Sequence, residues 1–200
     1  KLVLVEMKSF PLDISNRLKE RLKELSEQGF TEIILDLRNN SGGVFMESIR
    51  TAEHFLPEKS YLVRTYTRDK KLQNYISSNK EPFDFKVAVL VNEATASAAE
   101  ILSSALRDHA VALIIGTKTF GKGVFEKTYT LQNDFRVKFI TGAMYTPKGR
   151  AWQSKGLKPD FLIEQSPKFL KSLLKLDPKE RLKKDAAMIT AVKLLTSYEG

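Results

Sequence analysis

The segment Ile33-Ile34-Leu35-Asp36-Leu37 is followed directly by Arg38-Asn39-Asn40-Ser41-Gly42-Gly43. An apolar run that ends in polar residues and paired glycines is typical of a buried strand leading into a loop. Leu2–Met7, Val87–Val91 and Val111–Ile115 are runs of the same kind. Such continuous runs are typical of parallel strands that are covered on both faces.

Helical patterns alternate with these strands. One helix is expected where four apolar residues recur at helical spacing before Gly29, namely Ile14, Leu18, Leu22 and Leu25. Further helices are expected over residues 45–55 and 97–107, and a strand over residues 61–67. Residues 68–84 are charged and irregular, which predicts a surface excursion. The repeated strand–helix units predict an α/β fold with a mostly parallel sheet.

The C-terminal part of the chain differs in pattern. Residues 126–131 and 135–143 flank a turn signal and predict a hairpin. Residues 165–200 hold apolar residues at helical spacing together with 8 basic and 4 acidic side chains. We therefore expect a core over residues 1–164 and a helical tail over residues 165–200.

Composition excludes several classes of protein. There is no cysteine, so disulfides and thiolate chemistry are excluded, and two histidines make a zinc hydrolase a poor fit. No apolar run approaches the roughly 20 residues of a membrane span. The net charge of +9 favours acidic partners, but no recognisable nucleic-acid-binding module accompanies it.

Three loops follow expected strands, where ligand sites lie in such sheets. The Gly42-Gly43 loop suits either an oxyanion hole or a plain turn. Ser97 lies at a strand-to-helix junction, where helix amides can stabilise negative charge, although it or Thr95 could simply cap the helix. Lys122 stands between two glycines and is either functional or an exposed turn residue.

A serine nucleophile needs a base. His109 follows Ser97 by twelve positions, mostly on one expected helix, which separates them by about 18 Å. His54 shows no partner pattern. A lysine can replace histidine when it is kept neutral, for example by burial. Ser97 with Lys122 is the pairing that the sequence supports.

Five motifs occur in a familiar order, at residues 35–43, 89–100, 116–123, 145–150 and 156–160. Together they closely resemble the C-terminal processing peptidases, also called tail-specific proteases, over nearly the whole chain. The resemblance implies a crotonase-like fold and a Ser–Lys mechanism without metal or organic cofactor. It also implies a PDZ domain upstream, which is not visible in this sequence.

The resemblance assigns roles by position. It implies Ser97 as nucleophile, Lys122 as general base, and Gly42 or Gly43 with Ala98 as oxyanion-hole donors. Positions that support the dyad would be Glu100, Asp108 and Thr119.

The chain departs from the family pattern at Glu126, where glutamine commonly helps to orient the lysine amine. An ionised carboxylate beside Lys122 favours the charged ammonium and opposes its work as a base. Thr95 is a milder departure, because serine is more frequent there.

The expected function is therefore a serine endopeptidase of the C-terminal processing type, acting through an acyl-enzyme on proteins or peptides with accessible C-termini. The resemblance implies an extracytoplasmic bacterial enzyme, with a second copy or an adaptor as further partners. One alternative is an inactive peptide-binding or scaffold relative, which Glu126 favours. Another is an acyl-thioester enzyme that uses the Gly42-Gly43 amides.

Overall fold

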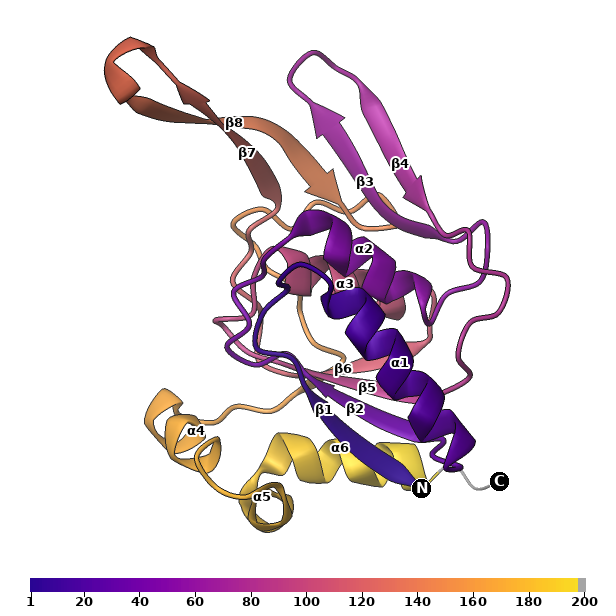
Figure 1. Ribbon diagram of the computed structural model, residues 1–200. Coiled ribbons are helices and arrows are strands. Elements are labelled where there is room, and N and C mark those ends of the chain that lie inside the picture. The colour runs from indigo at the N-terminus through magenta and orange to yellow at the C-terminus, as the bar shows by residue number, and fades with distance from the viewer. Residues whose placement is uncertain (198–200) are drawn as a thin grey trace.

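The computed structural model describes residues 1–197 and consists of two sheets with helices packed around them (Figure 1). The central sheet is parallel throughout, with strand order β1–β2–β5–β6–β9. Its strands are β1 (Leu2–Glu6), β2 (Glu32–Asp36), β5 (Lys86–Val91), β6 (Ala112–Gly116) and β9 (Phe161–Leu162). The predicted α/β class with a mostly parallel sheet is confirmed.

Helices cover both faces of the central sheet (Figure 1). One face carries α1 (Ile14–Glu27), α2 (Phe45–Glu53) and α3 (Ala98–Asp108), and the other carries α6 (Ala186–Thr196). Successive strand residues point to opposite faces, so each strand contributes to two cores. The smaller core lies under α6 and contains Ile34, Ala88, Leu90, Ile115, Met188 and Ala191. Burial on both faces explains the unbroken apolar runs in the sequence.

The second sheet is antiparallel and has the order β4–β3–β8–β7. It consists of β3 (Tyr61–Thr67), β4 (Leu72–Ile76), β7 (Val124–Thr130) and β8 (Arg136–Tyr145). The expected hairpin of β7 and β8 is confirmed, and it projects from the body beside the hairpin of β3 and β4 (Figure 1). The prediction that residues 68–84 are irregular was wrong for β4. Most β4 side chains are exposed, so no apolar alternation marked this strand.

The tail is helical, as predicted, within the described residues. It forms α4 (Pro167–Leu173), α5 (Pro178–Lys184) and α6. Ser166 and Asp177 cap the first two helices with their side-chain oxygens, directly before a proline that favours a helix start. Within residues 1–197, no helix has the length and apolarity needed to cross a membrane.

Candidate active site

Ser97 lies at the junction of β5 and α3 in an unusual backbone conformation, with φ 55° and ψ −115°. A non-glycine residue there stores strain, and such strain is concentrated at functional sites. Ala98 follows as the first residue of α3, so its N–H has no acceptor within the helix. The hydroxyl of a half-buried serine and a free helix amide therefore lie next to each other in the chain.

Gly42 packs directly against Ser97. A Cβ added at Gly42 would lie 2.9 Å from the Ser97 Cβ and 3.0 Å from the Ala96 carbonyl oxygen, and its φ of +102° also favours glycine. The Gly42 N–H donates to Asn40 Oδ1 at 2.9 Å. The Gly43 N–H has no hydrogen-bond partner within residues 1–197, and Gly43 is exposed. Of the two glycines, Gly43 thus offers the available amide.

The Glu100 carboxylate joins the serine loop to the lysine loop. Oε2 accepts from the backbone N–H of Ser97 and of Lys122, both at 2.8 Å. Oε1 accepts from the Thr119 hydroxyl at 2.5 Å and from the Gly121 N–H at 2.8 Å. Glu100 is fully buried. Its two oxygens therefore fix the backbone at Ser97 relative to that at Lys122.

Glu100→Gln should destabilise the protein, because each oxygen of the carboxylate accepts two hydrogen bonds and an amide nitrogen would face two donors in either orientation. We expect a loss of about 2–3 kcal/mol in the free energy of unfolding, measured by chemical denaturation. Glu53→Gln is the control, since that carboxylate accepts from Ser78 near the surface. An unchanged denaturation midpoint for Glu100→Gln would refute this role.

The Lys122 side chain points toward Glu126 rather than Ser97. Its Nζ lies 3.4 Å from Glu126 Oε2, and no hydrogen bond joins it to Ser97 in the described part of the chain. Lys138 approaches the same carboxylate oxygen more closely, at 2.8 Å. The hydrogen bond from Lys138, then that from Lys122, lowers the pKa of Glu126 although desolvation opposes this. Glu126 is therefore ionised at neutral pH.

The structure does not bring Asp108 to Ser97. It ends α3, eleven residues after Ser97, and a helix of that length separates them by about 16 Å. Its carboxylate hydrogen-bonds to the Arg150 guanidinium and accepts from the Lys148 N–H at 3.1 Å. The structure places Asp108 as an anchor for residues 148–150. Thr119, by contrast, does lie at the site, on Glu100.

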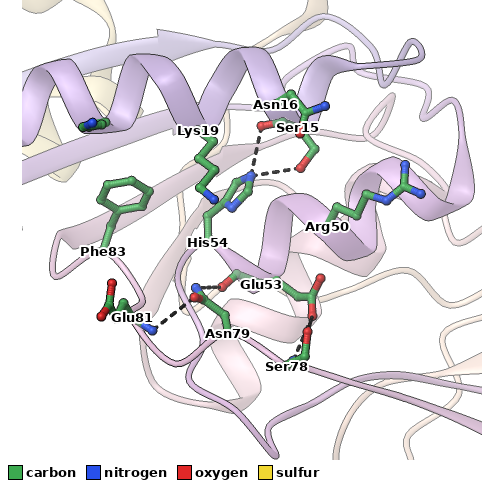
Figure 2. Close-up of a pocket in the computed structure, with 11 residues that line it drawn as sticks. Ser15, Asn16, Lys19, Arg50, Glu53, His54, Ser78, Asn79, Glu81 and Phe83 are labelled. Carbon is green, nitrogen blue, oxygen red and sulfur yellow. Dashed lines mark hydrogen bonds between the residues drawn. The ribbon is translucent and has the colours of Figure 1, made fainter.

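A second serine lies beside a histidine at the C-terminal end of α2, although no pattern in the sequence indicated a partner for His54. His54 Nε2 lies 2.9 Å from both the hydroxyl and the carbonyl oxygen of Ser15, beside a cavity of about 450 Å³. Figure 2 shows the His54 ring pointing toward Ser15. A ring nitrogen that faces a carbonyl oxygen carries the proton, so it does not also accept the serine proton as a base would. Burial lowers the pKa of His54. This pair joins α1 to the end of α2.

His109 lies away from Ser97, as its spacing predicted. Its Nε2 is 2.7 Å from the carbonyl oxygen of Tyr61, and it follows the last residue of α3.

Comparison with known proteins gives one family. Residues 1–163 match peptidase family S41. The chain is 35% identical over 172 residues to a probable CtpA-like serine protease of Staphylococcus aureus, covering 84% of this chain and 34% of the relative. A protein of the same description from Staphylococcus epidermidis is 34% identical over 169 residues, covering 83% and 34%.

Comparison with solved structures gives a match to the same kind of protease. The photosystem II D1 C-terminal processing protease superimposes with a TM-score of 0.80 and 29% identity, over 93% of this chain and 47% of that one. The chain thus spans about a third of the length of the curated relatives it matches and about half of this structure.

Proposed function

The chain belongs to peptidase family S41, and from this premise we propose that it is a serine endopeptidase of the C-terminal processing type. Ser97 is the nucleophile and Lys122 the general base. The observation that carries the proposal is the Glu100 carboxylate, which binds the backbone of both residues. The strained conformation of Ser97 beside the free amides of Ala98 and Gly43 supports it.

The proposed reaction has two halves. The neutral Lys122 amine takes the Ser97 hydroxyl proton while Oγ attacks the peptide carbonyl carbon, and the Gly43 and Ala98 amides stabilise the resulting oxyanion. Collapse breaks the C–N bond, Lys122 returns the proton to the leaving amine, and an acyl-enzyme remains. Water, deprotonated by Lys122, then releases the acyl group as a carboxylic acid product and restores Ser97.

Lys122 has to leave Glu126 and lose its proton before it can serve Ser97. The ammonium form is the one that a carboxylate at 3.4 Å favours. Lys138 also forms an ion pair with Glu126, and this second pair weakens the attraction between Glu126 and Lys122. Cleavage should therefore rise with pH as Lys122 becomes neutral.

Glu126→Gln should move this rise to lower pH, because it removes a negative charge that stabilises the ammonium of Lys122. We expect kcat/KM for an unstructured protein substrate at low salt to rise at lower pH in this variant than in the wild-type protein. Lys138→Gln should shift the rise in the opposite direction, since Lys122 then faces Glu126 alone. Superimposable profiles for the three proteins would refute the coupling.

Substrate is proposed to add as a strand to the free edge of β7, which begins two residues after Lys122 and lies at the end of its sheet. Strand addition recognises backbone and tolerates varied side chains. Proteins or peptides with accessible C-termini are the proposed substrates. An extracytoplasmic location, an upstream PDZ domain or adaptor, and a homo-oligomer stay proposals from the family resemblance.

The pairing of Lys122 with Glu126 also favours a second candidate, a peptide-binding relative without turnover. It predicts binding of peptide tails but no cleavage at any pH, and no gain from Glu126→Gln. Cleavage by the wild-type protein that disappears in Ser97→Ala would exclude it.

A further inference from the structure

Two charged side chains of the C-terminal helices are buried against the core. Asp185 has 0% of its surface exposed and Arg181 has 2%. Removing a charge from water costs several kcal/mol unless partners compensate it. Their partners lie at the ends of β1 and β2, outside the tail.

Asp185 connects α6 to Arg38, which lies two residues after the end of β2. Its Oδ1 accepts from the N–H groups of Ala187 and Met188 at 3.2 Å, which caps α6. Its Oδ2 lies 2.7 Å from Arg38 Nη1. The same guanidinium donates to Asp36 at 2.9 and 2.7 Å. Burial lowers the pKa of Arg38, but the two carboxylates raise it well above its ordinary value, so Arg38 carries its positive charge.

Arg181 of α5 reaches the same cluster from the other side. Its Nη1 is 2.7 Å from Glu6 Oε1 and 3.6 Å from Asp36 Oδ2. Asp36 thus lies between two arginines, one of them from the tail.

Asp36 and Arg38 of this ion cluster lie a few residues before the loop that carries Gly42 and Gly43. The Leu37 carbonyl oxygen accepts from the Asn40 N–H at 3.1 Å and from the Thr95 hydroxyl at 2.9 Å. Asn40 in turn accepts from the Gly42 N–H through its side chain and from the Ala96 N–H through its carbonyl, both at 2.9 Å. The turn at residues 37–40, which begins between Asp36 and Arg38, is therefore hydrogen-bonded both to the loop of Gly42 and to the loop that precedes Ser97.

We propose that Asp185 and Arg181 are positioning residues, through which the docked tail sets the position of the Gly43 amide relative to Ser97. This inference rests on the proposed protease function. A buried ion pair contributes little net stability compared with apolar packing, so what it contributes here is the fixed contact between the tail and the residues at the end of β2. The tail is then part of the catalytic assembly and not only a cover for the sheet.

Asp185→Asn tests this, because asparagine still caps a helix but loses the charge that faces Arg38. We expect kcat to fall about tenfold with KM within about twofold of wild type, as for a displaced oxyanion donor. A peptide aldehyde, which places an oxygen in the hole when it bonds to Ser97, should bind more weakly by a similar factor. Hydrogen exchange of residues 39–43 should become faster.

Asp177→Asn is the matched control. Asp177 caps α5 by accepting from the Lys179 N–H at 2.8 Å and has no ion pair in residues 1–197. It should leave kcat and exchange of residues 39–43 unchanged. If Asp185→Asn does not fold, Arg181→Lys is measured in its place. Lysine keeps the positive charge on a shorter side chain, and we expect the same changes in kcat, aldehyde binding and hydrogen exchange.

Wild-type kcat and wild-type exchange in the tail variant would overturn the proposal, as would an equal loss in Asp177→Asn. If the wild-type protein cleaves nothing, the protease proposal fails, while the exchange measurement still decides whether the tail positions this loop.

Discussion

Ser97→Ala should abolish peptide hydrolysis, with kcat reduced by roughly 10⁴- to 10⁶-fold, the range seen when a serine protease loses its nucleophile. Ser97 packs against Gly42 and directly precedes Ala98, so its hydroxyl lies beside the proposed oxyanion-hole amides. The free energy of unfolding should stay within about 0.5 kcal/mol, since alanine meets the same strain at φ 55°. Turnover of an unstructured protein and thermal unfolding measure the two quantities.

Ser103→Ala is the control for this prediction. Ser103 lies on the same helix, is buried, and donates its hydroxyl to the Ala99 carbonyl oxygen at 2.7 Å. It should lose about 1 kcal/mol of stability and keep full activity. If Ser97→Ala retained more than about a hundredth of the wild-type rate, Ser97 would not be the nucleophile.

Gly42→Ala should have the second-largest effect, because it acts on the nucleophile through the backbone. The added Cβ would meet the Ser97 Cβ at 2.9 Å and the Ala98 nitrogen at 3.1 Å, so Ser97 has to move. A misplacement of a catalytic group by about 1 Å can cost about 100-fold in kcat. Alanine at φ +102° adds strain of about 1–3 kcal/mol.

Gly29→Ala separates the effect of backbone strain from the effect of the contact with Ser97. Gly29 also has a positive φ, +76°, but nothing lies within 4 Å of a Cβ built there. It should lose about 1 kcal/mol and retain activity. Steady-state kinetics beside chemical denaturation would show whether Gly42→Ala loses activity beyond its loss of stability; an active Gly42→Ala protein would contradict the contact with Ser97.

The central sheet could be predicted because its strands are buried on both faces, as the run at residues 33–37 shows. β4 and β9 could not. β4 is largely exposed and β9 has only two residues, so neither leaves an apolar pattern in the sequence.

The site was predictable to the extent that its motifs resemble a known family. That resemblance pointed to Glu100, whose contacts with Ser97 and Lys122 explain the choice of residue. The sequence also indicated that Glu126 lies beside Lys122, but not that Lys138 of the neighbouring strand β8 approaches the same carboxylate oxygen. The ion pair of Arg38 with Asp185 joins positions far apart in the chain, and each alone looks like an ordinary charged residue.

The position of α6 has a consequence for the newly made chain. α6 covers the face of the sheet that carries Ile34, Leu90 and Ile115, and it is synthesised after every strand of that sheet. A chain that stops at residue 170 therefore lacks the helix that covers this apolar face of the sheet. An exposed apolar surface of this kind binds chaperones or causes aggregation. α6 therefore protects the assembled sheet from contacts of its apolar face with other chains.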